Sequence, residues 1–325
     1  MTPAKRVAIA CLVTVLLLGL LLSQIDLRSV VRNLYSLGLA GNLLALALWA
    51  ATYSLRAHRF SILLSPHSPP FARLLGLTAV YMFALRLLPM RTGEFSYLYL
   101  VRSNSSASLA KAGATLAFAR VLDMLTVLLL FCAAALLRAK LSFALTLNLA
   151  LVSVTLVLLL LFMDRLLRET GVLLEWLSRG HRKLPRRLAR FAEETAEEVV
   201  RLKARRVYLS TFAVTLVIWA TTFLTFYVFL RGFGISVSPP AALCGATAAV
   251  AASSLPINGI GGFGAVEVGW AAGFIAVGLS KQAAISSGVA MNLTTFVYSA
   301  LLAGIGLIVM ARRNVPGAIG EAASE

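Results

Sequence analysis

The chain has 325 residues, of which 59% are hydrophobic and only 13% are charged. Soluble domains contain about 45–50% apolar and about 25% charged residues, so this composition excludes a soluble globular enzyme and a disordered chain. The formal net charge is +17, from 30 basic and 13 acidic residues. In a soluble protein this excess would point to nucleic acid. In a chain this apolar we expect much of it to mark one side of a membrane, and no nucleic-acid partner.

The acidic residues are few, and their distribution is informative. Seven of the 13 lie in 164–206 and two lie in the C-terminal tail. The remaining four are Asp26, Glu94, Asp123 and Glu267, and the last three lie inside strongly apolar sequence. A carboxylate inside a membrane segment is costly, so these three are candidates for function.

The apolar runs, taken in chain order, predict an all-α polytopic membrane protein. Residues 7–23 follow Lys5 and Arg6 and lack a small-residue cleavage site, so we interpret them as an uncleaved first span rather than a signal peptide. Several of the later runs approach the ~20 residues that cross the hydrocarbon. They are 40–64, 71–89, 112–137, 142–163, 208–230, 240–255, 265–278 and 283–310.

The charge bias sets the topology. The segment 164–206 carries 12 Lys and Arg residues, so it is expected to be a cytoplasmic connector. The number of spans before 164–206 places that segment in the cytoplasm only if 71–102 enters the membrane and returns to the same side. With 240–278 folding back from outside, the chain has about six full spans, two re-entrant helical hairpins and cytoplasmic N- and C-termini. Within the connector, one helical stripe carries Leu184, Leu188, Phe191, Val199 and Leu202. It is either a surface-lying amphipathic helix or a solvated linker.

The same topology contains a repeat within a single membrane domain, 1–325. The units 40–137 and 208–310 both read as span, broken hairpin, span. Leucine-proline pairs mark both hairpins, at Leu88-Pro89 and Leu255-Pro256. The hairpins open from opposite sides, so the repeats are inverted, an arrangement that transporters use around a midplane site.

A first polar cluster lies in the first hairpin, with Arg86 just before the sequence LLPMRTGEF and Arg91, Gly93 and Glu94 within it. Irregular backbone at membrane depth survives only where it is buried in protein or lines a wet cavity. Exposed amide groups at a half-helix N-terminus, with arginine beside them, favour a phosphate. The alternative is an Arg91–Glu94 pair that only stabilises the hairpin.

A second cluster, Arg120 and Asp123, has the spacing of a pair on one helix face. A structural ion pair and a direct substrate role are equally supported.

A third cluster lies in SLPINGIGGFGAVE, with Asn258, Gly261, Gly262, Gly264 and Glu267. GIGGFG matches a dinucleotide fingerprint only literally, because membrane helices rather than a strand and helix flank it. Here the glycines would break a helix and let backbone approach a ligand. Glu267 would begin the next half-helix, and Asn292 takes roughly the place in the second repeat that Asp123 has in the first.

Nothing else in the sequence indicates catalysis. The three cysteines lie far apart in apolar runs, without metal or redox spacing. No nucleophile accompanies the carboxylates. We therefore expect no catalytic residue, no cofactor and no metal, and we do not expect an enzyme.

Together, LLPMRTGEF, ARVLD and SLPINGIGGFGAVE resemble the motifs of the lysylphosphatidylglycerol synthase transmembrane family, also called flippase-like. The likeness covers about residues 5 to 313. It implies a polytopic lipid-handling protein, and in the best understood members a flippase for aminoacylated phosphatidylglycerol. The motif positions it carries over are Arg91, Gly93, Glu94, Arg120, Asp123, Gly261, Gly262, Gly264 and Glu267. The soluble aminoacyl transferase domain of the two-domain members does not follow here, so this chain is not expected to make the aminoacyl lipid.

The leading hypothesis is a translocator in the bacterial inner membrane for a phospholipid or a polyprenyl-phosphate-linked head group. Arginines and the amides of 259–264 would hold the phosphate. Glu94, Asp123 and Glu267 would hold a cationic or hydroxyl-rich head group, or a coupling proton. The alternatives are a glycosyltransferase or accessory protein acting on lipid-linked sugars, and a scaffold of a lipid or hopanoid pathway. The expected partners are an anionic membrane lipid and a glycosyltransferase or lipid-synthesis enzyme, and an oligomer is left open.

Overall fold

Helices are the only regular secondary structure in the described part of the computed structural model, which covers 27–88, 91–137, 143–177, 183–205, 207–253 and 263–312. This confirms the predicted all-α class. The helices are α2 (Leu27–Ser36), α3 (Gly38–Leu64), α4 (Phe71–Leu87), α5 (Glu94–Asn104), α6 (Leu109–Leu137), α7 (Phe143–Leu177), α8 (Lys183–Ala204), α9 (Tyr208–Gly232), α10 (Pro239–Ser253), α11 (Ala265–Ala276) and α12 (Lys281–Arg312).

Four of these helices, α3, α6, α9 and α12, are long and apolar enough to cross a membrane, with 25 to 31 residues each. They match the predicted spans 40–64, 112–137, 208–230 and 283–310. A helix satisfies its own backbone groups, so a long apolar sequence can cross lipid only in this form. The predicted span 142–163 falls in α7, which continues to Leu177. The predicted span 7–23 lies outside the described residues.

Shorter helices form two hairpins where the sequence predicted broken segments. In the first, α4 ends at Leu87 and α5 begins at Glu94. Between them the backbone of Arg91 has φ 56°, a conformation that non-glycine residues rarely adopt. Gly93 is buried against the end of α4, where a Cβ would lie 2.4 Å from the Cα of Leu85. The second hairpin consists of α10 and α11.

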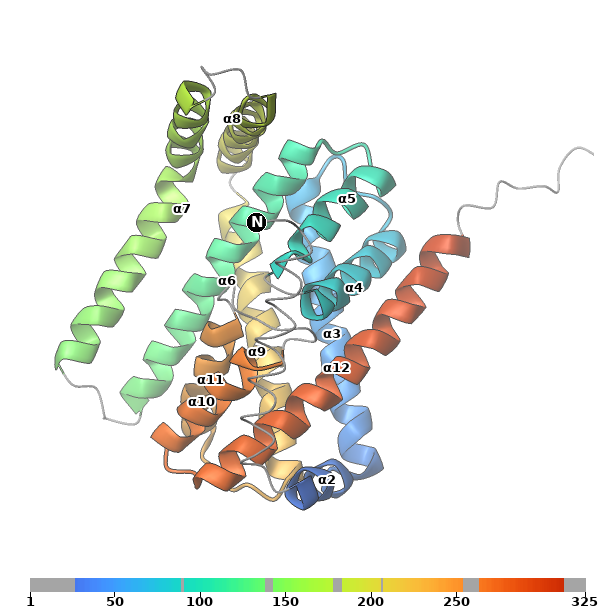
Figure 1. Ribbon diagram of the computed structural model, residues 1–325, viewed down its shortest axis with the longest axis vertical. Helices are drawn as coiled ribbons and strands as arrows, with labels where there is room; N and C mark the ends of the chain where they lie inside the picture. Colours follow the sequence, from blue (N-terminus) through green and yellow to red (C-terminus); the bar gives the residue numbers. More distant parts are fainter. Residues whose placement is uncertain are drawn as a thin grey trace, which may run out of the picture.

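The hairpins pack against helices far away in sequence. Helix α4 lies against α12 and α10 lies against α6, while α3 packs along α9. The crossing of α4 and α12 depends on Gly76 and Gly306, because a Cβ on either one would lie under 3.0 Å from the carbonyl oxygen of the other. Small residues of this kind let membrane helices approach backbone to backbone. The two halves of the chain therefore form one body (Figure 1).

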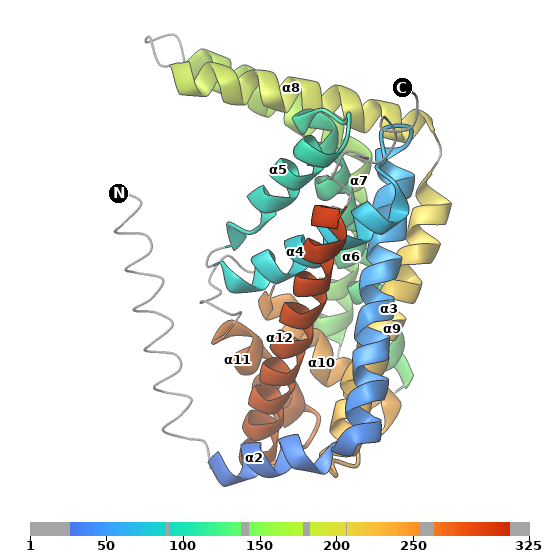
Figure 2. The same ribbon diagram turned by 90° about the vertical axis from the view of Figure 1, so that its right-hand side faces the viewer.

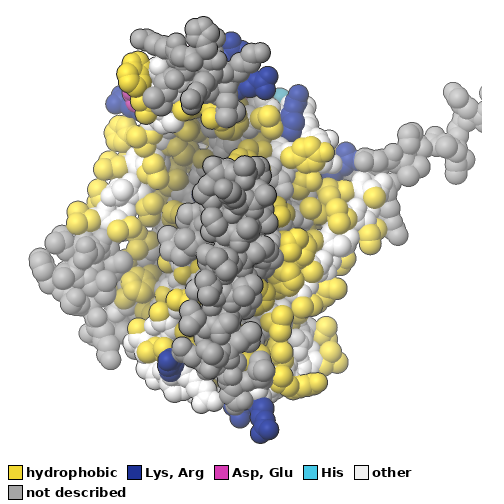
Figure 3. Space-filling model, in the orientation of Figure 1, with side chains coloured by type: hydrophobic (Ala, Val, Ile, Leu, Met, Phe, Trp, Pro, Cys, Tyr) yellow, Lys and Arg dark blue, Asp and Glu magenta, His cyan; other side chains and the backbone are white. Residues whose placement is uncertain are grey.

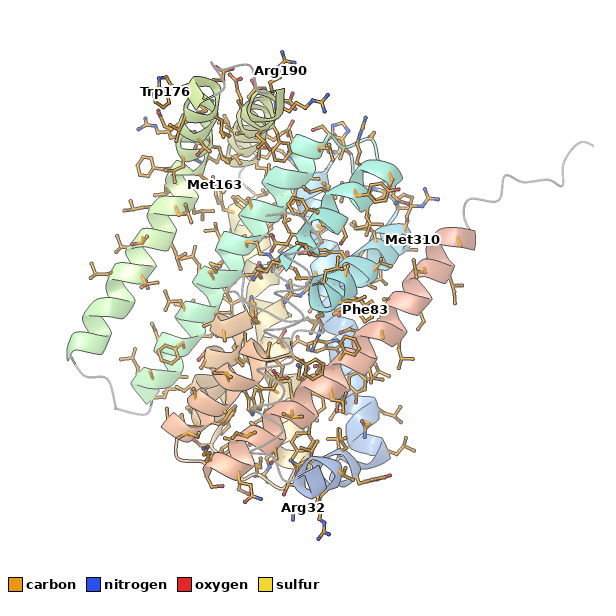
Figure 4. The ribbon with its side chains drawn as sticks, in the orientation of Figure 1. Arg32, Phe83, Met163, Trp176, Arg190 and Met310 are labelled. Carbon is orange, nitrogen blue, oxygen red and sulfur yellow. The ribbon has the colours of Figure 1, made fainter. Side chains whose placement is uncertain are left out.

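Two polar helices lie at opposite ends of this body. Helix α8 lies across one end, at a steep angle to the long helices, and α2 lies at the other (Figure 2). Arg190 of α8 and Arg32 of α2 mark these ends (Figure 4). Between them, hydrophobic side chains cover much of the visible surface, while Lys and Arg gather toward the ends (Figure 3). This is the distribution expected for a protein that crosses a membrane.

Helix α8 is packed on protein rather than free in solvent. Lys111 of α6 pairs with Glu198 of α8, with 3.1 Å between Nζ and Oε2. Val199 and Leu202 of the predicted stripe are buried and Phe191 is partly buried, but Leu188 is 46% exposed. The prediction that Leu188 belongs to the buried face was wrong, because smaller side chains on either side of Phe191 occupy the buried positions. These are Ala189, Ala192 and Ala196. The side chain of Leu184 lies outside the described residues.

Candidate functional site

A cavity of about 670 Å³ lies in the middle of the body, between helices of both halves. Its charged and amide side chains come from α3, α4, α6 and α12 and from the break before α5. They are Arg56, Arg86, Arg91, Arg120, Asp123 and Asn292. Its apolar wall includes Met124, Leu128 and Phe131 of α6, with Val152 and Leu156 of α7. Charged and apolar walls thus meet in one space.

The first cluster is assembled around the carboxylate of Glu94. Its Oε1 accepts hydrogen bonds from Arg91 Nη2 at 2.7 Å and Nε at 3.1 Å. Nε of Arg120 lies 3.2 Å from the same oxygen. The Arg91–Glu94 pair that the sequence offered as the alternative is present, and a second arginine joins it. Gly93 lies beside Glu94 and supplies the close turn.

The two arginines have further partners. Nη1 of Arg91 donates to the carbonyl oxygen of Ser253 at 3.1 Å, which links the first hairpin to the end of α10. Nη2 of Arg120 donates to the phenol oxygen of Tyr81 at 2.6 Å. Both guanidinium groups are therefore held in place by contacts other than Glu94.

Arg120 and Asp123 do not pair with each other, although their spacing on one helix face allowed it. Asp123 forms a two-point ion pair with Arg59, with Nη1–Oδ1 at 2.6 Å and Nη2–Oδ2 at 3.1 Å. Nε1 of Trp219 donates to Oδ1 at 3.0 Å, and Nη1 of Arg56 lies 3.6 Å from Oδ2. The helix spacing allowed either partner for Asp123. The neighbouring α3 supplies two arginines to it, while Arg120 turns toward Glu94 on α5.

Glu267 is at the third position of α11, as predicted for the start of a half-helix. Its Oε2 accepts a hydrogen bond from the backbone N–H of Gly264 at 2.7 Å, which caps the helix where the backbone of Gly264 has φ 101°. Nδ2 of Asn292 donates to its Oε1. Nη2 of Arg86 donates to Oδ1 of Asn292 and, at 3.0 Å, to Oγ1 of Thr295. A chain of polar contacts thus joins α4, α12 and α11.

Of the twelve predicted site residues, five line the cavity, namely Arg86, Arg91, Arg120, Asp123 and Asn292. Glu94 and Glu267 contact these residues directly, while Gly93 is the chain neighbour of Glu94 and Gly264 donates a hydrogen bond to Glu267. Asn258, Gly261 and Gly262 lie outside the described residues. The site therefore gathers residues from both hairpins.

Sequence reasoning missed Arg56, Arg59 and Trp219. The signal was present, because two arginines three residues apart stand inside the apolar run 40–64. A basic residue inside an apolar run indicates a functional site as strongly as an acidic residue does. The prediction was based on the scarce acids alone, so it did not include these arginines.

The charge balance of the cluster favours an anion. Five guanidinium groups, those of Arg56, Arg59, Arg86, Arg91 and Arg120, meet three carboxylates, an excess of two formal positive charges. Low-dielectric surroundings strengthen the field of such an excess. Arginine also matches the geometry of phosphate oxygens. Within the described ranges, no group of three or more His, Cys, Asp or Glu residues could hold a metal ion.

Long apolar helices around a charged interior cavity define a polytopic helical membrane protein. The chain belongs to the family described as the lysylphosphatidylglycerol synthase TM region, whose model matches residues 7–304. This confirms the resemblance seen in the three motifs. Searches of curated proteins and of solved structures returned no match.

Proposed function

We propose that this protein is a translocator that carries a lipid with an anionic phosphate head group across a bacterial inner membrane. The observation that supports it is the cavity, in which an arginine-rich wall is continuous with an apolar wall on α6 and α7. A lipid is the ligand whose two ends require those two environments. Family membership is consistent with a lipid substrate.

The packing pattern supports an inverted repeat, with α3 to α6 (within 40–137) equivalent to α9 to α12 (within 208–310). Under this equivalence, the contact of α4 with α12 corresponds to that of α10 with α6. The contact of α5 with α6 likewise corresponds to that of α11 with α12, and α3 packs on its own counterpart α9. In this proposal both hairpins are re-entrant, and the end that carries α8 faces the cytoplasm together with the termini.

In the proposed cycle, the phosphate group contacts Arg91, Arg120 and Arg86 while the lipid chains stay against the apolar residues of α6 and α7. A small rotation of one repeat against the other exposes the cavity to either side. The contacts that cross between the halves, such as Arg86 with Asn292, would change during this rotation.

The test is lipid flipping by the purified protein in liposomes. Phosphatidylglycerol with a fluorescent chain is placed in both leaflets, and a membrane-impermeant quencher reports the fraction that reaches the outer leaflet. We expect protein-containing liposomes to lose nearly all fluorescence and protein-free liposomes about half. Arg91→Gln should slow flipping at least about tenfold, because it removes a charged contact to phosphate. Arg201→Gln changes a side chain on α8 that is 66% exposed, and it should leave the flipping rate unchanged.

A fluorescent glucosylceramide, which lacks phosphate, serves as the matched lipid control and should flip no faster with protein than without. Equal quenching with and without protein, for phosphatidylglycerol and for a polyprenyl-phosphate lipid alike, would refute translocation. Turnover of a lipid-linked sugar by the same preparation would instead support the glycosyltransferase alternative.

A further inference from the structure

We propose that Glu94 competes with the ligand's phosphate group for Arg91 and Arg120, and thereby keeps phosphate binding weak enough for release. The inference rests on the proposed function and assigns Glu94 a role in setting affinity. It departs from the sequence-based expectation that this carboxylate holds a cationic head group or a coupling proton.

The position of the Glu94 carboxylate is the one expected for such a competitor. Oε1 of Glu94 lies between two guanidinium groups that line the cavity, 2.7 Å from Nη2 of Arg91 and 3.2 Å from Nε of Arg120. A phosphate oxygen is recognised by the same guanidinium groups. All of these contacts use Oε1, so one oxygen holds the place that a ligand oxygen would take.

Glu94 is the one partly accessible carboxylate among the three of the described cluster. Its side chain is 30% exposed, whereas that of Asp123 is 7% exposed and Glu267 is fully buried. Asp123 is fixed by Arg59 and Trp219, and Glu267 caps α11. Releasing either buried carboxylate would strand a charge in an apolar interior. Glu94, at the first position of α5, can leave the arginines at lower cost because protein does not enclose its side chain.

The two arginines have contacts that hold them in place when Glu94 leaves. Arg91 keeps its hydrogen bond to the carbonyl oxygen of Ser253, and Arg120 keeps its hydrogen bond to Tyr81. The donors are therefore preorganised for an anion whether or not Glu94 is present. Removing the charge of Glu94 should strengthen phosphate binding rather than weaken it.

The experiment is a binding titration of the purified full chain, followed by tryptophan fluorescence, because Trp49 and Trp219 line the cavity. The probes are inorganic phosphate, which tests the arginine pair alone, and dihexanoyl phosphatidylglycerol below its micelle concentration. Dihexanoylglycerol is the probe without phosphate. Glu94→Gln should bind both phosphate probes about tenfold more tightly than the wild type, equivalent to about 1.4 kcal/mol, and should release them more slowly.

Dihexanoylglycerol should bind the wild type and Glu94→Gln equally. The matched control is Glu198→Gln, which removes a glutamate paired with Lys111 outside the cavity and should leave every affinity unchanged. Glu94→Asp keeps the charge but shortens its reach, so its affinity for phosphate should lie between those of the wild type and Glu94→Gln.

The outcomes separate this inference from the proposed function. If the wild type binds phosphate and phosphatidylglycerol but a folded Glu94→Gln binds them equally or less tightly, the inference is overturned and the phosphate site stands. If Glu94→Gln shows no cooperative melting, Glu94→Asp decides by the same criterion. If the wild type binds neither probe, the phosphate site and the proposed function fail together.

Discussion

Replacing Asp123 by Asn should destabilise the protein strongly, because the carboxylate is the shared acceptor of a buried network. It accepts two hydrogen bonds from Arg59, at 2.6 and 3.1 Å, and one from Trp219 at 3.0 Å. Asn keeps the volume but offers a single acceptor oxygen and no charge. The hydrogen bond from Nη2 of Arg59 is lost, at ~1.5–3 kcal/mol for a charged hydrogen bond, and the two bonds to the remaining oxygen lose their charge. The guanidinium of Arg59, 1% exposed, is left without its counter-ion. A total of about 3–5 kcal/mol follows, as is usual when one partner of a buried pair is removed.

The assay is thermal unfolding of the purified protein in detergent. A loss of this size should lower the melting temperature by roughly 6 °C or more. Asp164→Asn is the matched control, because Asp164 pairs with Lys203 nearer the surface and its loss should cost only about 0–1 kcal/mol. The triple variant Asp123→Leu with Arg59→Met and Arg56→Met removes the carboxylate together with both buried arginines that pair with it, and should recover much of the lost stability. An Asp123→Asn protein that melts within about 2 °C of the wild type would refute the reasoning.

Three further predictions use the same unfolding measurement. Gly93→Ala should prevent normal packing of the first hairpin, because its Cβ would meet the backbone of Leu85 at 2.4 Å. Gly113→Ala meets only a phenylalanine ring at 2.9 Å and should be tolerated far better, so equal effects would contradict this account. Glu267→Gln keeps one of the two acceptor oxygens and should lower the free energy of unfolding by about 1–3 kcal/mol. An unchanged melting temperature would show that the helix cap does not stabilise the protein. Arg205→Ala removes exposed contacts to backbone carbonyls and should cost under about 1 kcal/mol.

Much of the fold was predictable because apolar length and broken helices are local signals. The runs 40–64 and 208–230 are α3 and α9 almost to the residue. The break before Glu94 was predictable from charge parity and from the sequence LLPMRTGEF together. Helix α2 was not predicted, because its apolar and basic residues alternate over only ten positions and never form a long run.

Which residues form the site was easier to predict than which of them contact each other. Glu94, Asp123 and Glu267 were found because acids are scarce in apolar sequence. Their partners depend on which helices meet in space, and spacing along one helix cannot decide that. Arg59 reaches Asp123 from a helix 64 positions away, and Asn292 reaches Glu267 from the following helix.

The crossing of Gly76 with Gly306 also has a consequence for synthesis. Helix α4 has its main packing partner in α12, so the first hairpin cannot complete its contacts when it emerges. The residue that Gly76 contacts is added 230 positions later. At ordinary translation rates that is a delay of roughly 10 to 50 seconds. Throughout this interval, the arginines near the end of α4 must be sheltered by water, lipid head groups or the insertion machinery. The cavity is thus completed only near the end of synthesis of the chain.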